Sequence, residues 1–409
     1  MDSTGPVPST SLAIAMVCPY SLSRPGGVQG QVVGLARALS ERGHRVAVFA
    51  PLDAVADAPP RIDLVTTGRS VPLPANGSVA PVSLSVPAVV RALRALRVGR
   101  FDVVHVHEPF SPGLPFGLLV GAGLPPLVAT FHRSGGSPFY AALRPLTRRL
   151  ARRFAVRCAV SPAARATAAN ALGGEYDVGF NGVEIDRFRE VEPWPRPGPT
   201  VLFLGRHEER KGLGILLSSF EGLRRSSDGV APPDGAATPP TLWVAGDGPL
   251  TASLRQRHPE ASDLHWLGVL TEEEKVRRLV AADVVCAPSL GGESFGVVLL
   301  EAMAARAVVV ASDIDGYRLA AGGHAVLVPP GDVAPLTEGL VRALGVVGSP
   351  AGSPAGRPGG SPLGEGGGTP ADRKLWLDGG AEWAAHWSMG RLAEWYEVRY
   401  RSAVVRPGA

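Results

Sequence analysis

The stretch from Ser289 to Glu301 combines residue types that can bind a phosphate group. It reads Ser-Leu-Gly-Gly-Glu-Ser-Phe-Gly-Val-Val-Leu-Leu-Glu and follows an apolar run, 281–288, that predicts a short buried strand. The paired glycines allow a tight turn, and Ser294 is expected to cap a helix that continues through Phe295. A helix N-terminus after a glycine turn offers free N–H groups and a positive dipole end to a phosphate. Taken alone, the stretch is equally compatible with an ordinary turn and a solvated glutamate.

Two cations follow another predicted strand, 200–204, and strengthen the case for an anion site. Arg206 and Lys211 lie in Gly-Arg-His-Glu-Glu-Arg-Lys-Gly, residues 205–212, at the carboxyl end of that strand. Cations in this position can hold a diphosphate, whereas the intervening Glu208, Glu209 and Arg210 are interpreted as a solvated charged loop.

Two carboxylates complete the predicted site. Glu293 precedes the helix and faces whatever its N-terminus holds, and Glu301 lies further along the same helix. With the cations, this set suits a nucleoside diphosphate whose ribose hydroxyls meet Glu301. It also suits a nucleotide that departs as a leaving group, because its negative charge is stabilised as it leaves.

Three histidines lie on predicted strands. His105 and His107 share one face at strand spacing, and with Glu108 nearby a metal site is conceivable but has no further ligand cluster to support it. His132 ends the predicted strand 127–132, at the strand end where α/β proteins place their sites. A lone histidine is often structural, so both interpretations of His132 stay open.

Composition limits the class of protein. The 409 residues are 45% hydrophobic, and no apolar run reaches the length of a membrane-spanning helix. Cys18, Cys158 and Cys286 are too far apart for a metal motif and fit a reducing cytoplasm. Residues 1–193 hold 20 basic and 13 acidic side chains, and residues 194–409 hold 21 and 24. The basic half is expected to meet an anionic surface.

The order of predicted elements indicates an α/β protein with two Rossmann-like domains. A first domain is expected at 11–190, a second at 198–380, and a C-terminal helix at 381–403 that crosses back to the first. Gly/Pro-rich inserts near 226–240 and 345–371 are expected to be disordered, as is a leader at 1–10. The first strand-loop-helix lacks the Gly-x-Gly-x-x-Gly pattern, which makes a nicotinamide dinucleotide unlikely.

A basic amphipathic helix is predicted at 86–100. Its basic side carries Arg91, Arg94 and Arg97, with Arg100 just beyond, and Val89, Leu93 and Leu96 form the opposite side. A second basic cluster contains Arg148, Arg149, Arg152 and Arg153. An anionic bilayer surface would attract such a helix, although a solvated helix face remains the alternative.

Several motifs together resemble the retaining GT-B glycosyltransferases of family 4. They are Gly205-Arg206…Lys211-Gly, Gly246-Asp-Gly-Pro, Asn181-Gly-Val-Glu-Ile-Asp-Arg-Phe and Glu293-x7-Glu301. Further segments resemble the actinobacterial phosphatidylinositol α-mannosyltransferases of that family. These are Val17-Cys-Pro-Tyr-Ser, Pro25-Gly-Gly-Val-Gln, Asn76-Gly-Ser-Val-Ala, His105-x-His-Glu-Pro, Ala129-Thr-Phe-His and 287–296. The similarity runs from about Ala13 to Tyr400, apart from the inserts.

The resemblance implies a GT-B fold, two Rossmann-like domains facing a cleft, and transfer of mannose from GDP-mannose to the inositol ring of phosphatidyl-myo-inositol. By resemblance, Glu293 contacts the transferred sugar, Glu301 binds ribose, and His132 is essential near the sugar. Other implied donor residues are Gly27, Arg206, Lys211, Ser294, Phe295, Gly296 and Val297, and the implied acceptor residues are Tyr20, Gln29 and Asn76.

The same resemblance implies a retaining reaction in which departing GDP helps to deprotonate the acceptor hydroxyl, with no pair of hydrolase-like carboxylates. The expected location is the cytoplasmic face of the cell membrane, peripherally bound. No tightly bound cofactor, resident metal or nucleic-acid partner is expected, and Mg²⁺ is at most a stimulatory ion. Asp313-Ile-Asp315 resembles a metal-binding motif but is interpreted as a structural strand end.

Some positions depart from the family pattern. The loop after His132, Arg-Ser-Gly-Gly-Ser-Pro, is less rich in hydroxyl groups, and Arg306 stands where a small residue is expected. These departures are compatible with a different nucleotide sugar or a different acceptor within family 4. A protein that binds nucleotide sugars without catalysis is the alternative outside the enzymes, since fold alone does not determine function.

Overall fold

A computed structural model describes residues 11–24, 26–53, 61–75, 78–135, 144–227, 239–348 and 369–405. The predicted leader, Asn76 and most of the two predicted inserts lie outside these residues. The chain forms two compact units, which we call unit 1 (Met1–Gly182 with Met389–Ala409) and unit 2 (Val183–Ser388). The division falls before the predicted boundary at residue 190, so the segment that follows Gly182 belongs to unit 2.

Unit 1 is built on a parallel sheet of seven strands in the order β3-β2-β1-β6-β7-β8-β9. Most of its strands are nearly continuous apolar runs because helices cover both faces of the sheet. The strands are β1 (Ala13–Val17), β2 (Arg45–Ala50), β3 (Ile62–Thr66), β6 (Val103–His107), β7 (Leu127–Phe131), β8 (Phe154–Ala159) and β9 (Asp177–Val178). A separate antiparallel hairpin joins β4 (Val71–Ala75) to β5 (Ser78–Val82).

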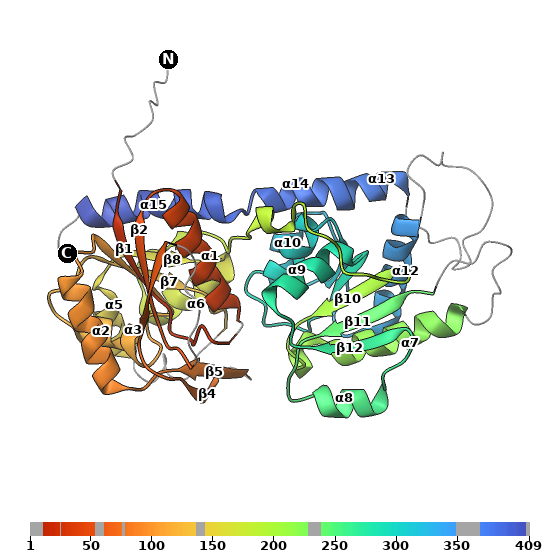
Figure 1. Ribbon diagram of the computed structural model, residues 1–409, viewed down its shortest axis with the longest axis horizontal. Coiled ribbons are helices and arrows are strands. Elements are labelled where there is room, and N and C mark those ends of the chain that lie inside the picture. The colour runs from red at the N-terminus through yellow and green to blue at the C-terminus, as the bar shows by residue number, and fades with distance from the viewer. Residues whose placement is uncertain are drawn as a thin grey trace, which may run out of the picture. The chain divides into compact units, whose positions relative to one another are not determined.

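Two helices far apart in sequence share one face of this sheet. The helices α1 (Gly27–Glu41) and α15 (Met389–Val405) contact each other and bury apolar side chains against the strands (Figure 1). The opposite face is covered by α2 (Val86–Val98), α3 (Leu114–Val120), α5 (Arg144–Ala151) and α6 (Pro162–Leu172). The prediction that a C-terminal helix returns to the N-terminal domain is therefore confirmed.

The prediction of one uninterrupted C-terminal helix is wrong. The chain forms α14 (Gly379–Ala385) within unit 2, breaks at residues 386–388, and starts α15 at Met389 within unit 1. Two backbone contacts tie the break to the start of unit 2: Val183 N donates to Trp387 O at 2.8 Å, and Val183 forms a parallel bridge with Ser388.

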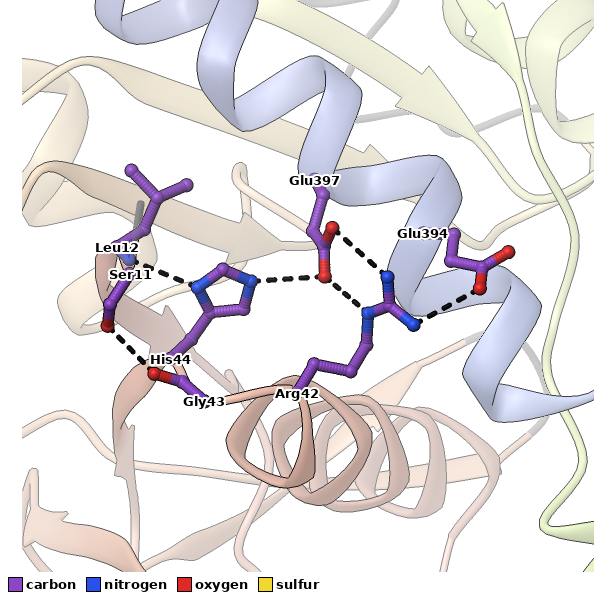
Figure 2. A network of polar contacts seen from close by, with 7 residues as sticks. All are labelled: Ser11, Leu12, Arg42, Gly43, His44, Glu394 and Glu397. Atoms are coloured by element: carbon purple, nitrogen blue, oxygen red, sulfur yellow. Dashed lines mark hydrogen bonds and ion pairs between the residues drawn. The ribbon is translucent and has the colours of Figure 1, made fainter. Parts of the chain in front are cut away.

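A polar network connects α15 to the turn between α1 and β2 and to the segment before β1 (Figure 2). His44 accepts a 3.0 Å hydrogen bond from the backbone N–H of Leu12 through Nδ1, and its Nε2 lies 3.0 Å from Glu397 on α15. Arg42 pairs with the same carboxylate and with Glu394. Since His44 Nδ1 accepts a hydrogen bond, Nε2 is the ring nitrogen that carries a proton and donates it to Glu397.

We expect Glu397→Gln to lower the free energy of unfolding by about 1 to 2 kcal/mol at pH 7, because hydrogen bonds to a charged group are lost. Burial raises the pKa of Glu397, but hydrogen bonds from Arg42 and His44 outweigh it and lower the pKa below its ordinary value of 4.5. The stabilisation is therefore complete above pH 4.5 and disappears as the pH falls through the lowered pKa. Calorimetry at several pH values tests this expectation. Glu394→Gln, at a more exposed partner of Arg42, should change stability less; equal losses would contradict the prediction.

Unit 2 repeats the architecture with six parallel strands in the order β12-β11-β10-β13-β14-β15. The strands are β10 (Thr200–Leu204), β11 (Thr241–Ala245), β12 (Leu264–Gly268), β13 (Val284–Ala287), β14 (Val308–Ser312) and β15 (Val326–Val328). One face packs against α7 (Leu213–Ser227), α8 (Thr251–Arg257) and α12 (Val333–Gly348). Further helices are α9 (Glu272–Ala281), α10 (Val297–Ala304), α11 (Asp315–Ala321) and α13 (Pro370–Arg373).

The two sheets confirm the predicted α/β class with Rossmann-like units, and the carboxyl ends of their parallel strands carry the loops discussed below. Among the described residues, no helix is both long enough and apolar enough to span a bilayer.

Candidate active site

The loop after β10 places several charged side chains beside the loop after β13. A short 3-10 helix, Glu209–Lys211, ends at Gly212, which has a left-handed φ of 68°. A Cβ atom at Gly212 would lie 2.0 Å from the carbonyl oxygen of Pro288, so only glycine permits this close approach. Leu290 N also donates to Arg210 O at 2.7 Å. These backbone contacts therefore hold the cationic loop after β10 against the loop that carries Glu293.

Glu293 is the centre of this charged cluster. Its Oε1 atom lies 2.7 Å from Lys211 Nζ and 2.8 Å from Arg210 Nη1, and Ser289 Oγ donates to it at 3.4 Å. The structure thus brings the predicted Lys211 and Glu293 together. It also shows that the interpretation of Arg210 as a solvated side chain is wrong, because Arg210 binds the central carboxylate.

The interpretation of Glu208 as part of a solvated loop is wrong as well. Its side chain is only 5% exposed and lies between two guanidinium groups, 3.0 Å from Arg206 Nη2 and 3.1 Å from Arg210 Nε. A buried carboxylate is stable only when it is paired, and here one carboxylate orients both arginines. We call Arg206, Glu208, Arg210, Lys211 and Glu293 the Glu293 cluster. In contrast, Glu209 is exposed, as expected.

The helix after Glu293 begins later than the sequence suggests. The first residue of α10 is Val297 and its N-cap is Gly296, with φ 88°, so Ser294 does not cap the helix as predicted. The side chain of Phe295 is 1% exposed and packs edge-to-face on Trp387 with ring centroids 5.2 Å apart. The side chain of Phe295 is therefore committed to packing, whereas the backbone N–H groups of the segment lack intrahelical acceptors at a helix start and can be offered to a ligand.

Glu301 lies on α10 and is paired with a lysine that the sequence analysis did not identify. Lys275 Nζ on α9 is 3.0 Å from Glu301 Oε1 and 3.2 Å from Glu272. Burial lowers the pKa of Lys275, but the two carboxylates outweigh it, and the pKa is raised. Lys275 is therefore charged, and its contact with Oε1 orients the side chain of Glu301.

In unit 1, His132 directly follows β7, as predicted, and is 8% exposed. Burial lowers its pKa to about 4 and outweighs an opposing effect of the Asn181 side chain, so the imidazole is neutral at pH 7. Its Nε2 atom lies 2.8 Å from His107 Nδ1 at the end of β6. The backbone N–H groups of His132 and Arg133 donate to Glu108 Oε1 at 2.6 and 2.9 Å.

The shared face of His105 and His107 is confirmed, but their environment differs from that of a metal site. Their rings lie 4.2 Å apart, and His105 bonds to Tyr400 and Thr130 at 2.7 Å each. No group of three or more candidate ligands that could hold a metal occurs among the described residues. The Asp313-Ile-Asp315 segment follows β14, and both aspartates pair with Arg318.

The predicted acceptor residues lie at the same strand ends of unit 1, except Asn76, which is outside the described residues. Tyr20 bonds to the side chain of Ser111; burial and then the nearby charge of Glu108 raise its pKa. Gln29 is 8% exposed and donates to Ser21 O and Arg24 O at 3.4 Å, so it braces the preceding loop. Gly27 opens α1 and has space for a Cβ atom, so the packing of the unit does not itself require glycine there.

The four arginines of the predicted membrane helix are exposed. Arg91, Arg94 and Arg97 lie on α2 and Arg100 just after it, whereas Ala92 and Leu96 are buried against the sheet. Val86 and Val90, 70% and 60% exposed, add apolar surface on the same helix. The second predicted cluster is less uniform, because Arg153 turns inward and donates to Leu119 O and Gly121 O.

Two parallel-stranded units with these sites at their strand ends define a glycosyltransferase of the GT-B class. A solved glycosyltransferase structure from Rickettsia africae ESF-5 matches with a TM-score of 0.68 at 14% identity, covering 98% of this chain and 100% of that one. Residues 25–187 match the family described as Glycosyltransferase Family 4, and residues 198–345 match Glycosyl transferases group 1.

Within this class, the sequence is 40% identical over 345 residues to the phosphatidyl-myo-inositol mannosyltransferase of Mycobacterium leprae (strain TN), covering 81% of this chain and 87% of that protein. A GDP-mannose-dependent alpha-(1-6)-phosphatidylinositol monomannoside mannosyltransferase of Mycobacterium tuberculosis (strain CDC 1551 / Oshkosh) is 29% identical, over 72% and 78% of the two chains. The chain belongs to the phosphatidyl-myo-inositol mannosyltransferase family of glycosyltransferases.

Proposed function

We propose that this glycosyltransferase moves mannose from GDP-mannose to the inositol ring of phosphatidyl-myo-inositol, with retention of configuration, as the first step of phosphatidylinositol mannoside synthesis. The names of its relatives support the sugar and the lipid, and the more distant one supports the donor. The observation that carries the proposal is the Glu293 cluster, which gathers three cations and two carboxylates at a strand end.

The cluster supplies what departure of a nucleoside diphosphate requires. When the glycosidic bond to the diphosphate breaks, negative charge grows on the leaving oxygen, and preorganised cations stabilise it most in the transition state. Arg206 and Lys211 are the proposed diphosphate ligands, and the backbone of Ser294 to Val297 adds N–H donors. Glu293 is then free to accept hydrogen bonds from sugar hydroxyls.

Glu301 is the proposed ribose ligand. Its carboxylate is held by the charged Lys275, so one oxygen is fixed and the other is available to hydroxyl groups. A carboxylate that accepts hydrogen bonds from two adjacent hydroxyls is a common way to recognise ribose.

We propose that His132 contacts the transferred sugar. Tyr20, Gln29 and Asn76 are the proposed contacts of the inositol phosphate, and Gly27 is the proposed contact of the diphosphate. The imidazole of His132 is neutral, so it contributes hydrogen bonding rather than charge. The proton of the acceptor hydroxyl passes to the departing diphosphate, and the new bond forms on the face that the leaving group vacates. This step needs no resident cofactor, and Mg²⁺ acts only as a stimulatory ion; persistence of transfer in EDTA tests this point.

The helix α2 is the proposed contact with an anionic membrane, which places the enzyme peripherally on the inner face of the cell membrane. Replacing Arg91, Arg94 and Arg97 together by glutamine should weaken binding to phosphatidylinositol-containing vesicles by about 100-fold at low salt, since each cation near the surface contributes about 1 kcal/mol. Flotation or sedimentation of vesicles measures this change. Triple replacement of the exposed Arg189, Arg257 and Arg318 in unit 2 is the matched control. Equal effects of both triple variants would remove α2 from the proposal.

The decisive experiment is transfer of radiolabelled mannose from GDP-mannose to phosphatidylinositol in vesicles, with UDP-glucose and UDP-N-acetylglucosamine as competing donors. A mannosylated lipid, formed without loss to the competitors, supports both substrates. Binding of GDP-mannose without modification of the lipid would overturn the acceptor, and preference for a uridine nucleotide would overturn the donor.

A further inference from the structure

Two residues that the proposed reaction does not itself use, His107 and Glu108, contact His132 and hold it in position. His107 is 2% exposed, and its Nδ1 atom lies 2.8 Å from His132 Nε2. The two rings stack at 25° with centroids 5.1 Å apart. Burial lowers the pKa of both histidines, so two neutral rings share one hydrogen bond and only one of the bonded nitrogens carries a proton.

The other ring nitrogen of His107, Nε2, indicates which of the two bonded nitrogens carries the proton. His107 Nε2 is buried without a hydrogen-bond partner among the described residues. A buried N–H group without an acceptor is rarer in proteins than a buried lone pair without a donor. The proton of His107 therefore belongs on Nδ1, from which it is donated to His132. Since His132 Nε2 accepts that bond, the proton of His132 is on Nδ1.

Asn181 lies close enough to His132 to raise the pKa of its ring, an effect that burial outweighs. The amide oxygen of Asn181 is buried without a hydrogen-bond partner among the described residues. In this assignment the Nδ1–H group of His132 can donate to the oxygen of a sugar hydroxyl or a phosphate.

Glu108 fixes the backbone on which the ring is mounted. It is a non-glycine residue with φ 47°, a left-handed conformation that is strained for it and persists only where its surroundings enforce it. The conformation lets one carboxylate oxygen accept from the N–H groups of both His132 and Arg133. The adjacent residues His107 and Glu108 thus hold the side chain and the main chain of His132, respectively.

We propose that His107 and Glu108 are positioning residues that lock His132 in its Nδ1–H tautomer, so that the ring presents a fixed hydrogen-bond donor to an oxygen of the substrate. The tautomer follows from the geometry of unit 1 alone. Its importance for turnover rests on the proposed function, in which His132 meets the transferred sugar.

Nitrogen-15 NMR of histidine-labelled protein tests the tautomer without any reaction. The His132 signals are assigned by their loss in His132→Gln. In the wild type we expect Nδ1 in the range of a protonated ring nitrogen and Nε2 in the range of an unprotonated one. In His107→Leu the donor is gone, and a mixture of tautomers is expected at His132. In His107→Asn the amide N–H can replace Nδ1–H, and the wild-type pattern should return. A wild-type His132 protonated on Nε2, or an unchanged pattern in His107→Leu, would overturn the proposal.

Kinetics then test the link to turnover. We expect His107→Leu to lower kcat by about 10- to 100-fold with little change in the KM for GDP-mannose, because the ring is misplaced while donor binding in unit 2 is intact. His107→Asn should restore most of the activity, and Glu108→Gln should reduce it less than His107→Leu. His44→Gln is the matched control, because His44 is an equally buried histidine of unit 1 that bonds to Glu397 instead. Equal losses of kcat in His107→Leu and His107→Asn, at equal melting temperatures, would refute the positioning role. If the wild type transfers no mannose at all, the proposed function fails while the NMR result still decides the tautomer.

Discussion

Replacing Lys211 by alanine is expected to lower mannosyl transfer by about 100- to 1,000-fold, the usual effect of removing one preorganised donor that stabilises developing charge. The ammonium group lies 2.7 Å from Glu293 and is the proposed partner of the departing diphosphate. Binding of GDP should weaken as well, because the same cation contacts the nucleotide before and after bond cleavage. Steady-state transfer and calorimetric titration with GDP measure the two effects.

Lys374→Ala is the matched control for this variant. The protein has only three lysines, and Lys374 is exposed at the start of the π-helical segment Lys374–Asp378 and is not part of the Glu293 cluster. Its replacement should change neither transfer nor GDP binding. Near-normal transfer in Lys211→Ala, with an unchanged melting temperature, would contradict the assignment of the diphosphate site.

Glu293→Gln is expected to separate transfer from nucleotide binding. Transfer should fall by about 100-fold or more, because the carboxylate that accepts from the sugar becomes a weaker, neutral acceptor. Binding of GDP should become about 3- to 10-fold tighter. In the free protein Glu293 pairs with both Lys211 and Arg210, and the diphosphate must compete with it for Lys211.

The exposed Glu209, in the same loop, provides the control of equal charge. Glu209→Gln removes a negative charge near the site without removing a partner of Lys211, and it should leave transfer and GDP binding close to those of the wild type. Weaker GDP binding in Glu293→Gln would show that Glu293 supports the nucleotide site instead of competing for its cations.

The sequence predicted the elements well where local pattern decides the structure. Apolar runs ending in glycine or polar residues located strands such as β7, β10 and β13, and the rule that parallel sheets carry sites at their carboxyl ends placed His132 correctly after β7. The pairing of Lys211 with Glu293 was also accessible, because both follow predicted strands of one unit.

Other features depend on contacts that sequence spacing does not specify. Gly296 lies two residues after Ser294, and its left-handed backbone starts the helix at Val297. No propensity argument chooses between Ser294 and Gly296 as the N-cap. Glu208 looks like any surface glutamate until the folded loop places it between two arginines. The His107–His132 bond required knowing that β6 and β7 are neighbours with His107 paired to Thr130.

One departure from the family pattern has a geometrical explanation. Arg306 has φ 62° just after the end of α10, a position where glycine adopts the left-handed conformation without strain. The resemblance to the family predicted a small residue there, and the left-handed backbone gives the reason. The side chain of Arg306 is directed to Asp378, with which it forms an ion pair.

The return of α15 to unit 1 also determines the order in which the protein can fold during synthesis. Unit 2 is one continuous segment and can complete its core as soon as residue 388 has left the ribosome. Unit 1 cannot, because the face of its sheet beside α1 is covered by Leu392, Tyr396 and Tyr400, which are translated after the whole of unit 2. Unit 1 therefore keeps an uncovered apolar face while unit 2 folds. A chain that terminates before Met389 leaves the ribosome with that face exposed, which makes it a substrate for chaperones and prone to aggregation.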